Sequence, residues 1–122
     1  MLHRKENIIQ EKTEAYASRI VRLYIYLRDV KHEQTLSKQI LRSGTSIGAN
    51  TAESRNAQSK ADFINKLSVA LKETDETAFW LKTLYSGNYI TKKQLQSMMN
   101  DNEDIIRILV KIIKTSKENL QP

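Results

Sequence analysis

A segment of small residues in the middle of the chain, residues 42–53, constrains the fold most strongly. It contains two of the three glycines of the chain and no aromatic residue. Because Gly, Ser, Thr and Asn favour turns, composition alone would make it a linker between two helical hairpins. However, Gly44, Gly48 and Ala52 recur every fourth residue, which on a helix forms a stripe along one face. The spacing predicts a helix that packs closely against a neighbour, and this packing offsets the roughly 0.5–1 kcal/mol that each glycine costs.

Hydrophobic periodicity predicts three more helices around this one. The expected helices span about residues 8–31, 35–54, 60–86 and 92–117. Ser59 with Asp62, and Thr91 with Gln94, have the spacing of capping boxes at the starts of the last two helices. Gly87 is expected to end the third helix as a left-handed cap. Four helices joined by short turns predict an all-α fold, an antiparallel up-down-up-down four-helix bundle in a single domain over residues 1–122.

The same periodicity predicts the inner face of each helix. The expected inner residues are Ile9, Tyr16, Ile20, Leu23, Leu27 and Val30 in the first helix; Leu36, Ile40, Leu41 and Ile47 in the second; Phe63, Leu67, Ala70, Thr74, Ala78, Leu81 and Tyr85 in the third; and Leu95, Met98, Asn102, Ile105, Leu109, Ile112 and Ser116 in the fourth. Residues 105–113 are apolar around nearly two thirds of the helix, which is more than one core uses. This surplus predicts a second interface and therefore self-association.

Composition argues against most kinds of chemistry. Without cysteine, the chain offers neither a disulfide nor a thiolate ligand. His3 and His32 lack the carboxylate spacing of a metal site, and no Gly-rich phosphate loop occurs. We therefore expect no catalytic, cofactor-binding or metal-binding residues, and a protein that is not an enzyme. No apolar run approaches the roughly 20 residues of a membrane span, and the N-terminus lacks the apolar region of a signal peptide, so a cytoplasmic protein without membrane contact is expected.

The net charge of +6 favours an acidic partner, most often nucleic acid. Two basic stripes, one on the first helix and one on the last, are candidate contacts to a phosphate backbone. Their residues are Lys12, Arg19, Arg22, Arg107, Lys111 and Lys114. Such stripes are also typical of the solvated side of an amphipathic helix. Tyr16, Tyr24 and Tyr26 could stack on bases, although aromatic residues at helical spacing more often lie in the core.

The middle of the chain resembles the bacterial four-helix bundle family, also called the 23S ribosomal RNA intervening sequence protein. The motifs that carry the resemblance are SKQILRSGTSIGAN (37–50), Glu53, AQSKADF (57–63), KL (66–67), ALKE (70–73), ET (76–77) and WL (80–81). Only Thr51 and Phe79 depart from the family pattern, where Ile and Tyr are expected. Some members are encoded inside sequences that interrupt 23S ribosomal RNA genes. The family is also similar to the accessory protein of diversity-generating retroelements, a basic pentameric bundle that binds a reverse transcriptase and nucleic acid.

The resemblance implies a bundle that assembles into a ring-shaped homopentamer and has no established catalytic residues. It implies a packing and assembly motif on the second and third helices, composed of Ser43, Gly44, Ser46, Ile47, Gly48, Asn50, Ala52, Glu53, Asp62, Lys66, Lys72, Glu73, Glu76 and Trp80. The polar members are expected to hydrogen-bond within the bundle or across subunits. The sequence thus predicts a non-enzymatic oligomer associated with RNA or DNA. A protein–protein adapter, for example for a reverse transcriptase, is the alternative, and a toxin–antitoxin or stress module is a third hypothesis.

Overall fold

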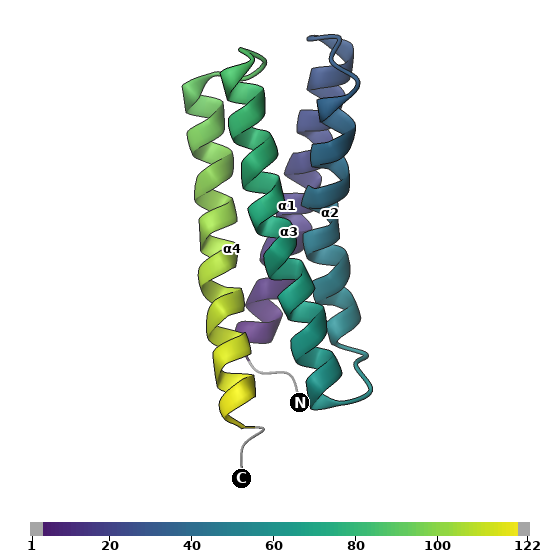
Figure 1. Ribbon diagram of the computed structural model, residues 1–122, viewed down its shortest axis with the longest axis vertical. Coiled ribbons are helices and arrows are strands. Elements are labelled where there is room, and N and C mark those ends of the chain that lie inside the picture. Colours follow the sequence, from purple (N-terminus) through teal and green to yellow (C-terminus); the bar gives the residue numbers. More distant parts are fainter. Residues whose placement is uncertain (1–3, 120–122) are drawn as a thin grey trace.

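The structure is a computed structural model that describes residues 4–119, apart from the side chain of Lys5. It consists of four α-helices, α1 (Arg4–Asp29), α2 (Leu36–Ser54), α3 (Lys60–Ser86) and α4 (Lys92–Glu118), which lie side by side in Figure 1. No strand occurs between residues 4 and 119. The prediction of an all-α fold with four helices is confirmed.

The chain reverses direction at each short connection (Figure 1). The reversal between α2 and α3 is visible in two ion pairs. Arg42, early in α2, binds Glu76 in the second half of α3. Glu53, at the end of α2, lies with its Oε2 atom 3.5 Å from Nζ of Lys66 near the start of α3. Each helix packs against two neighbours, α1 against α2 and α4, and α3 against α2 and α4.

The helix starts follow from local capping. Ser59 Oγ accepts the Asp62 N–H at 3.0 Å and begins α3. Thr91 and Gln94 form a complete capping box at the start of α4. In contrast, α1 begins four residues earlier than expected, at Arg4, because hydrophobic periodicity detects only the part of a helix that faces a core.

The end of α3 corrects one prediction. Gly87 has a φ of −85°, so it is not a left-handed cap. The left-handed residue is Asn88, with a φ of 64°. Asn tolerates this conformation better than other residues with a side chain, because its short polar group can hydrogen-bond locally. The chain therefore turns one residue later than the glycine suggests.

The connection between α1 and α2 is organised by a buried carboxylate, which the sequence analysis did not single out. Glu33 is only 8% exposed, and its carboxylate accepts the backbone N–H groups of Thr35, Leu36 and Ser37 at 3.2, 3.0 and 2.7 Å. Burial by itself raises the pKa of this carboxyl, but the backbone hydrogen bonds outweigh it and lower the pKa below the usual value. Glu33 thus caps the start of α2, where the free N–H groups need acceptors.

One hydrophobic core runs between the four helices. Its buried residues are Ile9, Tyr16, Ile20, Leu27, Ile40, Ile47, Ile64, Leu67, Ala70, Leu81, Leu84, Ile90, Met98, Ile105, Leu109, Ile112 and Ile113. Most of the expected inner residues of α1 and α4 are among them. Two expected core residues are exposed instead: Val30 (60%) and Tyr85 (40%). Val30 follows the last residue of α1, and the buried position in the last turn of α3 belongs to Leu84.

The close approach predicted for residues 42–53 occurs between α2 and α1. Gly44 and Gly48 are both buried. A Cβ atom on Gly44 would lie 2.7 Å from side-chain carbons of Ile20, and one on Gly48 would lie 3.3 Å from the carbonyl oxygen of Thr13. Because glycine has no side chain, Gly44 and Gly48 let the backbone of α2 lie close to α1.

Ala52, the third member of the expected stripe, is exposed and does not share this face. A four-residue repeat rotates by about 40° per step on a helix of 3.6 residues per turn. Two steps carry Ala52 about 80° away from Gly44, toward solvent. Thr51, seven residues after Gly44, lies within about 20° of it and takes the buried position.

Candidate nucleic-acid interface

The basic residues predicted on α1 differ in their surroundings, because α1 packs along α4 and some of them contact that helix. Arg19 is clamped to α4: its Nη1 atom lies 2.6 Å from Oδ2 of Asp101, and its Nη2 donates to Ser97 Oγ at 2.9 Å. Next to it, the buried hydroxyl of Tyr16 donates to the carbonyl of Met98 at 3.1 Å. Burial, with the negative charge of Asp101, raises the pKa of this hydroxyl, which remains a donor. The guanidinium of Arg19 is therefore bonded to α4, and its charge is paired within the bundle.

Lys12 also lies close to acidic residues. It lines a cavity of about 130 Å³ between α1 and α4, together with Asp101 and Asp104. On α4, Asp104 also forms an ion pair with Arg107 one turn further along the helix. Two predicted contacts, Arg19 and Arg107, are thus paired with Asp101 and Asp104, and a third, Lys12, lines the same cavity as these two carboxylates.

The third predicted contact of α1, Arg22, lies in a groove near the start of α4, which we call the α1–α4 groove. It has a volume of about 420 Å³. Its lining residues are Arg19, Arg22, Leu23 and Tyr26 of α1, and Lys93, Gln94, Ser97 and Met98 of α4. No carboxylate is among these lining residues. The groove therefore combines cationic side chains with an apolar and aromatic floor.

Lys93 was not predicted as a contact. Its signal in the sequence is the pair Lys92–Lys93 directly after the helix cap Thr91, which places two cations in the first turn of α4. Cations in a first turn meet the positive end of the helix dipole, and basic residues also begin α1 (Arg4) and α3 (Lys60), so this pair does not by itself indicate a ligand. That Lys93 lines the same groove as Arg22 is known only from the structure.

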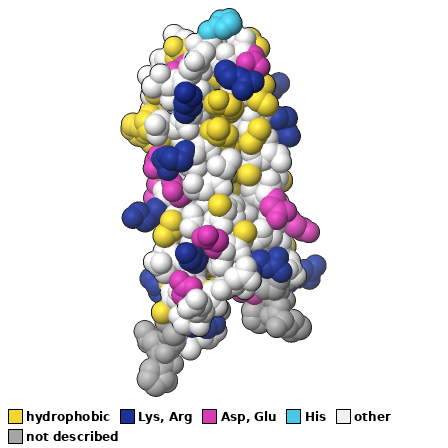
Figure 2. All heavy atoms as spheres, turned by 90° about the vertical axis from the view of Figure 1, so that its right-hand side faces the viewer, with side chains coloured by type: hydrophobic (Ala, Val, Ile, Leu, Met, Phe, Trp, Pro, Cys, Tyr) yellow, Lys and Arg dark blue, Asp and Glu magenta, His cyan; other side chains and the backbone are white. Residues whose placement is uncertain are grey.

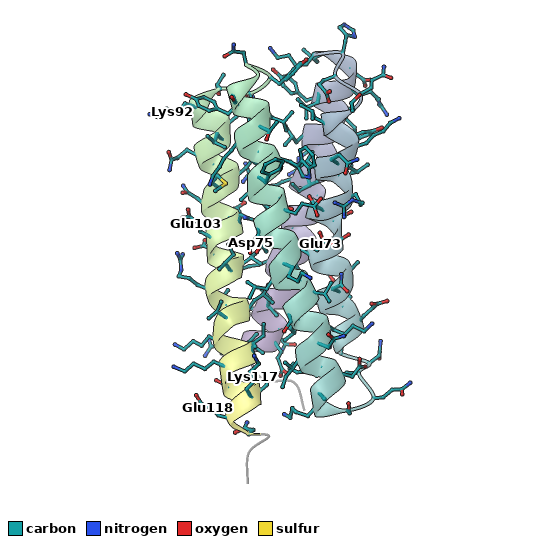
Figure 3. All side chains as sticks on the ribbon, viewed as in Figure 1. Glu73, Asp75, Lys92, Glu103, Lys117 and Glu118 are labelled. Atoms are coloured by element: carbon teal, nitrogen blue, oxygen red, sulfur yellow. The ribbon has the colours of Figure 1, made fainter. Side chains whose placement is uncertain are left out.

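The second predicted stripe lies at the opposite end of α4. Figure 3 shows Lys92 near one end of this 27-residue helix, Glu103 in its middle, and Lys117 and Glu118 near the other end. Lys111 and Lys114 are exposed near that second end. At 1.5 Å per residue, Lys93 and Lys111 lie about 27 Å apart along α4, so the structure separates the two basic regions.

A second groove lies beside this lower region and differs in character. It has a volume of about 490 Å³ and is lined by Leu71 of α3 and by Val110, Ile113, Lys114, Lys117 and Glu118 of α4. Its apolar residues are aliphatic, and a carboxylate accompanies the two lysines. We call this the α3–α4 groove.

The packing motif predicted on the second and third helices joins α2 to α3 within one chain. The buried hydroxyls of Thr77 and Ser43 form a hydrogen bond at 3.0 Å. Ile47 and Gly48 are also buried, whereas Asp62 lies in the first turn of α3 and accepts the Gln58 N–H at 3.2 Å. The expected hydrogen bonds of Ser43 therefore lie inside the bundle.

The charged members of this motif form a surface network on the same pair of helices. Arg42 binds Glu76 and lies 3.6 Å from Glu73, measured from Nη1 to Oε1. Trp80 Nε1 donates to Oε2 of Glu76 at 3.0 Å. Two further polar members bond along α2: Ser46 donates to the Arg42 carbonyl at 2.6 Å and Asn50 to the Ser46 carbonyl at 2.9 Å. The network holds α2 and α3 in register.

Among residues 4–119, no group of three or more His, Cys, Asp or Glu side chains is placed to hold a metal ion. His3 lies outside the described residues. Within the same range, no helix is long and apolar enough to cross a membrane.

Comparison with known proteins identifies the family. The family model described as 23S rRNA-intervening sequence protein matches residues 5–111. The chain belongs to this family. The chain is also similar to a protein of unknown function from the S23 ribosomal protein family of Bacteroides thetaiotaomicron VPI-5482, whose crystal structure was determined at 1.70 Å resolution. The two chains are 52% identical, with a TM-score of 0.90 over 90% of this chain and 98% of the other. No curated protein matches the chain significantly. The similarity to the retroelement accessory protein stays a prediction.

Proposed function

We propose that the protein is a non-enzymatic oligomer that associates with RNA through basic surfaces of its helices. The α1–α4 groove carries this proposal, because Arg22 and Lys93 meet there without a neighbouring carboxylate among the lining residues. The net charge of +6 supports it, and so does the membership of a family whose name refers to 23S rRNA. Lysine and arginine bind phosphates through charge, and binding releases counterions from the nucleic acid.

The test is the salt dependence of RNA binding. If Arg22, Lys93 and a further cation each contact one phosphate, affinity should fall about 20- to 40-fold between about 50 and 200 mM salt, the lower value applying to a single strand and the higher to a duplex. The assay is fluorescence anisotropy with a structured, fluorescently labelled RNA at both salt concentrations. Absence of binding at the lower concentration, or binding that does not change with salt, would contradict the proposal.

The oligomer we propose is a ring-shaped homopentamer, as the family resemblance implies. Two unlike apolar surfaces support head-to-tail contact between copies. On one side, Val21 and Ile25 of α1 are 40% and 42% exposed, and Figure 2 shows hydrophobic side chains gathered in the upper half of the face formed by α1 and α2. On the other side, the α3–α4 groove contains Leu71 and Val110. Contacts between two different surfaces close into rings when the rotation between copies allows it. A monomeric mass by light scattering at micromolar concentration would refute the oligomer.

A protein–protein adapter is the second candidate function, and one observation favours it. Phe79 is 58% exposed on α3, and its ring contacts that of Trp80 edge-on, with centroids 4.9 Å apart. Exposed aromatic residues are frequent anchors of protein interfaces. Co-purification from the native host separates the two functions. A protein partner, such as a polymerase, that remains bound after nuclease treatment and is lost on Phe79→Ala would favour the adapter.

A further inference from the structure

We propose that the α1–α4 groove is a binding site for single-stranded RNA, in which Arg22 and Lys93 hold phosphates and Tyr26 stacks on a base. This inference rests on the proposed association with RNA and assigns it to one place and one form of the ligand. It departs from the sequence-based expectation, which distributed the contacts along two helix stripes.

The charges of the groove are arranged on opposite walls. Arg22 is exposed on α1, and Lys93 is exposed on α4. Arg19 also lines the groove but is fixed by Asp101 and Ser97, whereas no carboxylate is among the residues that line the groove with Arg22 and Lys93. The N-terminal end of α4 adds its positive partial charge to the same side of the groove. An anionic chain lying along the groove would meet cations from both helices.

The floor of the groove explains why the ligand should be single-stranded. Leu23 and Met98 provide apolar surface, and Tyr26 provides an aromatic ring. The exposed Lys31 lies over one face of this ring, with its Nζ atom 6.0 Å from the ring centroid, so an incoming base would displace the Lys31 side chain and stack on the ring in its place. A duplex presents phosphates outward and keeps its bases stacked inside, and it would use only the cations. An unpaired base can enter the groove and stack on tyrosine, as in other single-strand binding proteins.

The size of the groove agrees with this ligand. Its volume of about 420 Å³ is within the roughly 300–1,000 Å³ typical of small-ligand pockets, which is sufficient for a nucleotide. The α3–α4 groove is of similar volume, but it has no aromatic residue among its lining residues, and it includes Glu118. It offers charge without stacking, which makes the lower end of α4 a suitable control region.

The first experiment compares removal of charge at the two regions. The double variant Arg22→Ala/Lys93→Ala and the matched control Lys111→Ala/Lys114→Ala each lose two positive charges. Binding of a short labelled single-stranded RNA is measured by anisotropy at about 50 mM salt. We expect the groove variant to bind at least about 10-fold more weakly than the control variant. Equal weakening by both variants would overturn the proposal, because charge alone would then explain binding.

The second experiment tests stacking. Tyr26→Leu should weaken binding of the single strand by about 5-fold or more, while binding of a duplex of the same length stays unchanged. Tyr26→Phe keeps an aromatic ring and should retain binding. Circular dichroism melting verifies that each variant is folded, and photocrosslinking of wild-type protein to RNA should label peptides that contain residues 22–26 or 93–98. Crosslinks confined to other segments, or a Tyr26→Leu variant with wild-type affinity, would overturn the site. If the wild-type protein binds neither the single strand nor the duplex, both the proposed function and this site are refuted. If RNA binds but the substitutions at Arg22, Lys93 and Tyr26 do not change its affinity, only the site is refuted.

Discussion

The close contact between α1 and α2 makes a sharp prediction for Gly44→Ala. On an ordinary helix position this change would stabilise the protein by about 1 kcal/mol, because alanine is the better helix former. At Gly44, however, the new Cβ would lie 2.7–2.8 Å from three side-chain carbons of Ile20. Carbon atoms prefer to be about 3.5–4.0 Å apart, and Ile20 is fully buried and branched at Cβ, so it cannot turn away cheaply.

The two effects oppose each other and can be separated. Overpacking of a core costs about 1–3 kcal/mol, so Gly44→Ala in the wild-type protein should leave the free energy of unfolding unchanged or lower it by up to about 2 kcal/mol. Ile20→Ala removes all three contacting carbons, at a cost of about 2–5 kcal/mol. In this second background, Gly44→Ala should stabilise by about 1 kcal/mol, because only helix propensity remains.

The measurement is a double-mutant cycle from urea unfolding, monitored by circular dichroism at one fixed protein concentration, since association would otherwise change the apparent stability. We expect a coupling energy of about 1–3 kcal/mol between positions 44 and 20. Ala49→Gly, at an exposed position of α2, is the control for propensity and should show no coupling to Ile20→Ala. The argument is refuted if Gly44→Ala stabilises the wild-type protein as much as it stabilises the Ile20→Ala variant.

Two further predictions concern buried polar groups. Glu33→Gln should lower the free energy of unfolding by about 1.5–3 kcal/mol at neutral pH, because the carboxylate accepts three backbone N–H groups. Since the pKa of Glu33 is lowered in the folded state, its contribution is full above the unfolded value near 4.5 and is lost as pH falls through the folded value. Between neutral and acidic pH, the free energy of unfolding should therefore fall less steeply with decreasing pH in Glu33→Gln than in the wild-type protein. The same dependence on pH in both proteins would contradict this. Thr77→Val should cost about 1–3 kcal/mol by leaving the Ser43 hydroxyl without its partner, whereas adding Ser43→Ala should recover most of the loss. A double variant as unstable as the sum of the single variants would count against a direct bond.

Local signals explain how far the helices could be predicted. The starts of α3 and α4 follow from Ser59 and Thr91, because a cap needs only the next three residues. The end of α3 was harder to place, since Gly87 and Asn88 both tolerate a left-handed conformation and only the path toward α4 selects Asn88. Glu33 was missed because its role depends on burial, which a polar segment does not reveal.

The candidate site could be predicted only in part. Helix periodicity placed Arg19 and Arg22 on one side of α1, but it did not show that Arg19 binds Asp101, 82 positions further along the chain. Nor did it show that Lys93 faces Arg22 across a groove. Both facts depend on how α1 and α4 pack, and neither helix carries that information alone.

The sequence by itself determined that this protein forms four helices and that two glycines let one helix approach a neighbour closely; the structure identifies that neighbour as α1. Both are consequences of short-range rules: the period of a helix, the chemistry of its caps and the absence of a side chain at Gly44 and Gly48. Only the tertiary structure decided which cations are neutralised and which gather in the α1–α4 groove. Electrostatic pairing depends on distances of a few ångströms between helices, and the packing of the core sets those distances.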